Sequence, residues 1–394
     1  MSPYRSFQYL EAGKDYRDFE LAPDVDRVPA YLVPLTKEEE ARADALMARH
    51  TIVSLHDHTS IFPARTEDFF AQRRQGRDAT GYAGLARSGT DVFFEAFMDG
   101  TATITSNAGW KWTDIIHDLG MRLSDIAHQD SVFVATTLED LRRAKAEGRI
   151  AFVIALEAAT MIENEVDRVD VLYGLGVRCM GITYSEANAL GSGLKEERDG
   201  GLTELGRQVV RRMDRLGMAI DVAHVGDRTS LDVIEASEHP IFITHAGARA
   251  LWDTPRMKPD EVIRACAAKG GVIGVEAAPH TTLTKAHPEH SIDSVMEHVA
   301  YCVDLVGADH VALGPDTLLG DHVGLHKAFA QQLSIGKIHR LPYKEVPYVK
   351  GMENPGESMR NAVRWLVAHG YGDGDIAKIA GGNVLRVLEA VWAR

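Results

Sequence analysis

The chain has little cysteine, no long apolar run and no excess of basic residues. Its three cysteines, Cys179, Cys266 and Cys302, lie in apolar segments without C-x-x-C spacing, which argues against a disulfide framework or a thiolate metal site. The first twenty residues carry charges throughout and lack the apolar core of a signal peptide, and nothing elsewhere reaches the length of a membrane span. These absences predict a cytoplasmic protein with no membrane partner.

A basic surface is also missing. Lysine and arginine total 43 against 57 aspartates and glutamates, which gives a formal net charge of −14. Such a chain repels nucleic acid and anionic lipid. We therefore expect a small-molecule substrate and no nucleic-acid partner.

Short β-rich apolar runs alternate with amphipathic helical segments along the 394 residues, 45% of which are apolar. This alternation is typical of repeated βα units around a parallel sheet. The eight predicted strands are Ile52–His58, Val92–Met98, Ile150–Glu157, Val177–Tyr184, Met218–His224, Pro240–His245, Val272–Glu276 and Val311–Asp316.

Eight such units favour an α/β fold of the closed (β/α)8 TIM-barrel type, over residues 51–394. A doubly wound open sheet is the alternative, but the first strand ends in His56-Asp57-His58 where that fold has a glycine-rich phosphate loop. Residues 1–50 are expected to form an N-terminal extension packed on the barrel, with a helix at Lys37–Arg49 capped by Thr36. The long loop at about 317–357 is either an active-site lid or an irregular surface insertion.

Metal-binding residue types stand at the ends of the predicted strands. In a barrel the carboxyl ends of the strands converge on one mouth, so side chains far apart in sequence meet there. The candidate metal ligands are His56, His58, Glu157, His224, His245 and Asp316.

Chance has to be weighed against this pattern. Seventeen histidines in 394 residues produce about one H-x-H by chance, and a single histidine at a strand end is more often a hydrogen-bonded core residue than a ligand. However, five runs place an ionisable group directly after an apolar strand, and burying those groups without a cation is costly. The positions, more than the composition, indicate a metal centre.

Imidazoles and carboxylates together suit two divalent cations, with zinc (Zn2+) the favoured ion. Glu157 can bridge the two cations as a permanent carboxylate. The pair would lower the pKa of a bridging water, so that a metal-bridging hydroxide attacks a polarised carbonyl. Asp316 is then placed to act as general acid/base, taking the proton and passing it to the leaving amine.

From about residue 50 to residue 388 the sequence resembles the membrane (renal) dipeptidase family of the amidohydrolase superfamily. The resemblance is carried by the segments SLHDH, ALE ending at Glu157, IDVAHV, PIFITHAGARAL, ALGPD and IAKIAGGNVLRVL. It implies that His56 and the residue two positions on bind one metal, that Glu157 bridges, that His224 and His245 bind the second metal, and that Asp316 is the acid/base.

The resemblance also implies a substrate-binding role for Arg256, which falls where the family has an arginine that grips the substrate carboxylate. Its alternative is an ordinary surface charge. Two positions depart from the family. His58 replaces an aspartate but still suits zinc, and Tyr184 stands where the family has a histidine that contacts the reacting amide. The Tyr184 hydroxyl either donates to an oxyanion or only packs.

The leading hypothesis is a zinc-dependent, dipeptidase-like metallohydrolase that cleaves the amide bond of a dipeptide or N-acyl amino acid. One alternative is a hydrolase of another small amide, lactam or ester. The other is a non-catalytic barrel that binds metal or ligand, and retention of both Glu157 and Asp316 counts against it. The resemblance suggests a homodimer, which no residue pattern supports independently.

Overall fold

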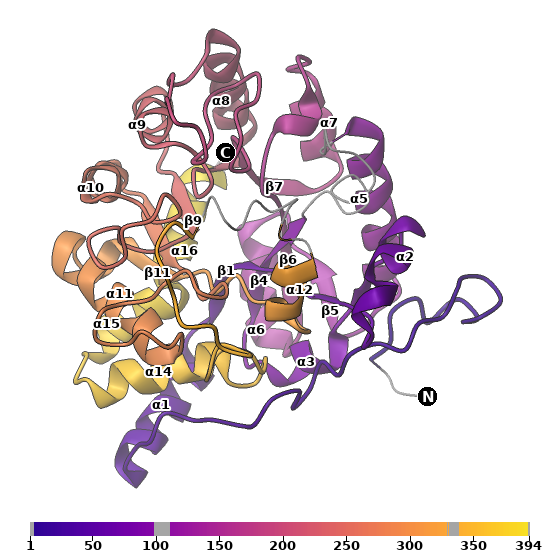
Figure 1. Ribbon diagram of the computed structural model, residues 1–394, viewed down its shortest axis with the longest axis vertical. Helices are drawn as coiled ribbons and strands as arrows, with labels where there is room; N and C mark the ends of the chain where they lie inside the picture. Colours follow the sequence, from indigo (N-terminus) through magenta and orange to yellow (C-terminus); the bar gives the residue numbers. More distant parts are fainter. Residues whose placement is uncertain (1–3, 98–110, 329, 331–338, 393–394) are drawn as a thin grey trace.

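The computed structural model describes residues 4–97, 111–328, 330 and 339–392. Within these ranges, eight parallel strands follow one another in chain order around a barrel (Figure 1). They are β1 (Val53–Asp57), β4 (Val92–Phe97), β6 (Ile150–Leu156), β7 (Val177–Gly181), β8 (Ala219–Asp221), β9 (Phe242–Ala246), β10 (Val272–Val275) and β11 (Val311–Leu313).

The last strand meets the first just beyond the end of β11. The Asp316 N–H donates to the His56 carbonyl at 2.8 Å, and the His58 N–H donates to the Thr317 carbonyl at 2.9 Å. These bonds join the two edges of the sheet. The predicted (β/α)8 barrel is confirmed, and the open doubly wound sheet is ruled out.

Each of the eight predicted strands coincides with an observed one, although their C-terminal boundaries were mostly placed too late. The predicted runs continue to His58, Glu157, His224 and Asp316, whereas the ladders end one to three residues earlier. The chain leaves the sheet there because these polar side chains turn into the mouth of the barrel. Met98, at the end of the second predicted strand, lies outside the described residues.

Three short strands were not predicted. β5 (Val132–Val134) pairs with the first half of β6, and β2 (Ser60–Ile61) forms an antiparallel pair with β3 (Ala79–Thr80). Runs of two or three residues are too short to show a period.

Helices surround the barrel (Figure 1). Their bounds are α1 Lys37–Arg49, α2 Phe69–Arg74, α3 Tyr82–Arg87, α5 Trp112–Ile126, α6 Leu138–Glu147, α7 Arg168–Gly174, α8 Glu204–Leu216, α9 Asp227–Ala236, α10 Asp260–Ala268, α11 Ile292–Val306, α12 His322–Ala328, α14 Ser358–Ala368, α15 Asp373–Ala377 and α16 Asn383–Trp392.

Side chains of each strand alternate between two cores. On β6, Ala151 and Val153 pack inside the barrel, in a cluster that α16 joins, whereas Phe152 and Ile154 pack outward in the cluster shared with the surrounding helices. The strand period of two produces this division. Continued beyond Ala155, the same alternation points Glu157 into the barrel mouth.

The residues before β1 lie along the barrel and contact its C-terminal helices (Figure 1). Helix α1 has the predicted Thr36 cap with a full capping box to Glu39, and it packs on α14. The Val33 N–H donates to the Asn361 side chain at 2.8 Å. Among the described residues, no helix is both long and apolar enough to cross a membrane.

Candidate metal centre

A bulge in β1 turns two histidines toward the barrel mouth. Leu55 packs in the barrel interior with Val53, yet the next residue, His56, faces the mouth together with His58. The register between β1 and β4 shifts between Ser54 and Asp57, and a bulge of this kind re-aims the side chains that follow it. The His58 Nδ1 hydrogen bonds to the Ala96 carbonyl at 3.0 Å, which directs its Nε2 into the site.

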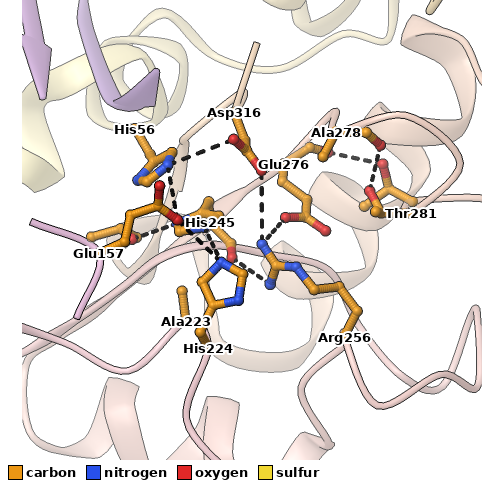
Figure 2. Close-up of polar contacts among 12 residues, drawn as sticks. His56, Glu157, Ala223, His224, His245, Arg256, Glu276, Ala278, Thr281 and Asp316 are labelled. Atoms are coloured by element: carbon orange, nitrogen blue, oxygen red, sulfur yellow. Dashed lines mark hydrogen bonds and ion pairs between the residues drawn. The ribbon is translucent and has the colours of Figure 1, made fainter. Parts of the chain in front are cut away.

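Glu157 lies at the centre of the histidines (Figure 2). Its Oε1 is 3.4 Å from the Nε2 of His58, and its Oε2 is 3.4 Å from the Nε2 of His224. The neighbouring β7 passes so closely that a Cβ on Gly181 would collide with the Glu157 carbonyl. Glycine at that position therefore lets the strand approach the residue that carries the carboxylate.

His224 and His245 form a second pair. Their Nε2 atoms are 2.9 Å apart, and the Nε2 of His245 is 3.8 Å from the Glu157 Oε2. The opposite ring nitrogens are held by hydroxyls, since His224 Nδ1 lies 3.1 Å from the Ser185 Oγ and His245 Nδ1 lies 2.7 Å from the Thr244 Oγ1. These bonds orient both Nε2 atoms toward Glu157.

Asp316 completes the cluster. It follows β11, where the last strand of the barrel meets the first. Its Oδ1 is 3.2 Å from the Nε2 of His58 and 3.6 Å from the Nε2 of His56. Its backbone has a φ of +52°, a left-handed conformation that aspartate tolerates better than most residues. The residue after Asp316 helps to hold this backbone conformation, because the Thr317 N–H and hydroxyl both donate to the Asp57 Oδ1 at 2.8 Å.

The donor set fits divalent cations. The six residues are between 0 and 9% exposed, and their ligand atoms fall into three groups within which all atoms lie within 4.8 Å of one another: His56, His58 and Glu157; His56, His245 and Asp316; and Glu157, His224 and His245. The His56 Nε2 and the Glu157 Oε1 are buried without a hydrogen-bond partner. Buried polar atoms of this kind need compensation, which a cation between them would provide.

Burial sets the protonation of most of these groups. It lowers the pKa of His56, His224 and His245 well below the usual value, which favours the neutral imidazole that a metal requires. Burial raises the pKa of the Glu157 carboxyl to about 8, so the ionised form is costly unless positive charge lies beside it.

The pKa of His58 is raised and that of Asp316 is lowered, opposite to the shifts of the other histidines and of Glu157. Burial opposes the charge on His58, but Glu157 and Asp316 outweigh it and raise the pKa of His58 to about 9. Burial also opposes the charge on Asp316, but the hydrogen bond from His58 and the charges of His245 and His56 hold its pKa well below the usual range. Asp316 is therefore the carboxylate of the cluster that stays ionised.

Arg256 points into the site and is not a surface charge. It is 3% exposed, and its Nη2 lies 3.9 Å from the Asp316 Oδ2 (Figure 2). The same Nη2 pairs with the Glu276 Oε2, and the Nη1 donates to the His245 carbonyl at 3.0 Å. Both terminal nitrogens of the guanidinium thus have partners within the protein.

Tyr184 lies on the His224 side of the cluster. Its ring centroid is 4.3 Å from that of His224, and the ring packs against an apolar cluster formed by Phe62, Phe69, Leu318 and Leu325. The ring therefore lies beside a candidate metal ligand, and its two predicted roles, oxyanion donor or packing residue, stay predictions.

A family model for membrane dipeptidases (peptidase family M19) matches residues 40–329. The chain belongs to this family. Its members are metal-dependent, and the cluster around Glu157 offers candidate metal ligands. The chain is accordingly a hydrolase of the dipeptidase class.

Curated relatives agree with this membership. A dipeptidase, tcpJ, of Claviceps purpurea is 24% identical over 94% of this chain and 81% of its own length. A dipeptidase, verJ, of Clonostachys rogersoniana is 27% identical over 71% of this chain and 63% of its own length.

Solved structures share the fold. An amidohydrolase from Pseudomonas aeruginosa superposes with a TM-score of 0.72 at 24% identity, covering 89% of this chain and 99% of its own. A metallopeptidase from Rhodobacter sphaeroides, bound to a phosphinate mimic of the dipeptide L-Ala-D-Ala, has a TM-score of 0.67 at 18% identity, covering 87% and 99%.

Four polar residues next to this dipeptidase-family centre were missed from the sequence: Asp57, Ser185, Thr244 and Glu276. Glu276 ends a predicted strand just as Glu157 does, so the same positional signal could have identified it. The other three act through other residues. Thr244 holds the adjacent His245, whereas the partners of Asp57 and Ser185 lie far along the chain and meet them only when the loops are folded.

Proposed function

We propose that this chain is a binuclear, zinc-dependent hydrolase that cleaves the amide bond of a dipeptide or an N-acyl amino acid. The observation that carries the proposal is the position of Glu157. Its two carboxylate oxygens face histidines from two different pairs, each at 3.4 Å, which is the arrangement that a bridging ligand needs. Asp316 also lies within reach of histidines from both pairs, but each oxygen of Glu157 faces a different pair.

In this proposal His56 and His58 hold one cation, His224 and His245 hold the other, and Glu157 belongs to both. The nitrogen-rich donor set favours zinc over magnesium or calcium, which prefer oxygen ligands. When bound, the two cations supply an activated water and polarise the scissile carbonyl.

Asp316 takes the proton from the attacking water and passes it to the leaving amine. Three features support this role. Its pKa is held below the usual range, its Oδ1 faces the histidines of the first pair, and the Asp57 contacts with Thr317 hold the loop that carries it. A general base works only if it is ionised and within reach of the proton.

Arg256 and Tyr184 are proposed to contact the substrate. The Arg256 guanidinium lies at the edge of the cluster and suits a carboxylate or carbonyl oxygen. The Tyr184 hydroxyl would donate to the oxygen that becomes negative during attack. The Rhodobacter metallopeptidase binds a dipeptide mimic, and this supports a dipeptide as the substrate class here.

The test combines metal analysis with a substrate panel. Purified protein is analysed for bound metal, and dipeptides of mixed stereochemistry, N-acyl amino acids, simple amides, lactams and esters are compared as substrates. We expect two equivalents of metal and turnover of a carboxylate-bearing amide. A protein that binds no metal after incubation with zinc, or that turns over nothing in the panel, would contradict the proposal.

A further inference from the structure

Glu276 lies beside the residue proposed to bind the substrate, and its position is tightly fixed. It follows β10 directly, its N–H donates to the Ala246 carbonyl at 3.1 Å, and its own carbonyl accepts from the Thr282 hydroxyl at 2.8 Å. The side chain is fully buried. The backbone therefore sets where the carboxylate lies, on the Arg256 side of the metal centre (Figure 2).

Its carboxylate pairs with the part of Arg256 that is nearest the reaction centre. The Arg256 Nη2 donates to Glu276 and is also the atom that lies 3.9 Å from the Asp316 Oδ2. The Nη1 is already bonded to the His245 carbonyl. Each of the two terminal nitrogens, which together suit bidentate binding of a carboxylate, thus already donates one hydrogen bond to the protein.

A substrate carboxylate at Arg256 would have to displace Glu276 or share the guanidinium with it. Burial raises the pKa of the Glu276 carboxyl to about 8 although Arg256 opposes this shift. Sharing therefore either brings two negative charges together in a buried setting, where repulsion is strong, or requires Glu276 to take up a proton and weaken its bond to Arg256. Displacement leaves the Glu276 charge buried without its partner, which is also costly. An uncharged acceptor, such as an amide or ester carbonyl, needs only one remaining N–H and meets no such repulsion.

We propose that Glu276 is a specificity-determining residue that weakens the binding of a substrate carboxylate at Arg256 and allows an uncharged group in its place. This inference rests on the proposed function, because it assumes that substrate lies against Arg256. If the inference holds, the preferred substrates are amides that place an uncharged group against Arg256, such as dipeptides with a blocked carboxyl terminus.

The experiment compares alanylalanine with its C-terminal amide, measuring release of alanine or alaninamide by the holoenzyme. In the wild type we expect a KM for the blocked peptide no higher than that for the free acid. In Glu276→Gln, kcat/KM for the acid should rise about tenfold relative to kcat/KM for the amide, mainly because KM for the acid falls. Glu276→Asp keeps the charge and should stay near the wild-type ratio.

Glu353→Gln is the matched control. Glu353 is a buried partner of Arg27, outside the metal cluster, so its loss should leave the ratio unchanged. If Glu276→Gln lowers kcat/KM by the same factor for both substrates, Glu276 only supports Arg256 and the inference is overturned. A wild-type KM tenfold lower for the free acid would overturn it even if the variant fails to fold. If no peptide or amide is hydrolysed at all, the proposed function itself is wrong.

Discussion

The two histidine pairs on either side of Glu157 are held in different ways. His224 and His245 each bond through Nδ1 to a side-chain hydroxyl, from Ser185 and Thr244. His58 bonds through Nδ1 to a backbone carbonyl, which can only accept, so this nitrogen carries the proton. A hydroxyl can donate or accept, and the tautomers of the second pair are consequently less constrained.

The electrostatic settings of the pairs differ as well. His58 lies between two carboxylates and its pKa is raised to about 9, whereas burial lowers the pKa of its pair partner His56 just as it lowers that of His224 and His245. We therefore predict that acid/base chemistry belongs to the side of the cluster formed by His58 and Asp316, and that His224 and His245 mainly serve to hold metal. Four experiments test this division.

Glu157→Gln should have the largest effect, because Glu157 serves both pairs. We expect loss of bound metal from both histidine pairs and turnover below detection, since a neutral amide cannot offset the charge of two cations. Elemental analysis and circular dichroism check the result. Metal content equal to that of the wild type would show that Glu157 belongs to neither ion.

Asp316→Asn should affect the chemistry more than the metal. We expect kcat to fall about 10²–10⁴-fold, the usual contribution of a general acid/base, with metal content close to that of the wild type. Unchanged turnover would mean that another group moves the proton.

His58→Ala and His224→Ala separate the two halves. Each removes a ligand from one proposed ion, so each variant should retain about one equivalent of metal. His58→Asp restores the residue type usual in the family and should retain both ions. Loss of all metal in either alanine variant would indicate a single shared site.

Thr244→Val should have the smallest effect. It removes the hydroxyl that orients His245, and such supporting partners usually contribute about 10–100-fold in metal affinity. Zinc titration with a competing chelator measures this, and Thr244→Ser should restore the wild-type affinity. An unchanged zinc affinity in Thr244→Val would show that His245 is oriented by packing alone.

Sequence reasoning identified the barrel because eight apolar strand runs alternate with amphipathic helical segments. It also placed Glu157 and His245 at the mouth from their positions at strand ends. Glu157 follows the alternation of β6, whereas His245 lies in a register shift between β9 and β10. Sequence reasoning did not anticipate the bulge before His56, which depends on the register with a neighbouring strand.

The partners of Arg256 and Asp316 could not be predicted in the same way. Glu276 meets Arg256 across a loop, and Asp57 meets Thr317 although 260 residues separate them. Such contacts depend on how loops fold above the barrel, and apolar periodicity carries no information about that. The assignment of 1–50 as a separate extension, the lid role of 317–357, the cytoplasmic location and the homodimer stay predictions.

The seam between the two ends of the barrel has a consequence for biosynthesis. His56 emerges early from the ribosome and Asp316 much later, yet the backbone bond between them helps to form the cluster. A nascent chain that stops before Asp316 lacks both this bond and the hydrogen bonds from Thr317 to Asp57. Incomplete polypeptides should therefore be inert toward peptides in the cell, and activity would begin only after the final strand has docked.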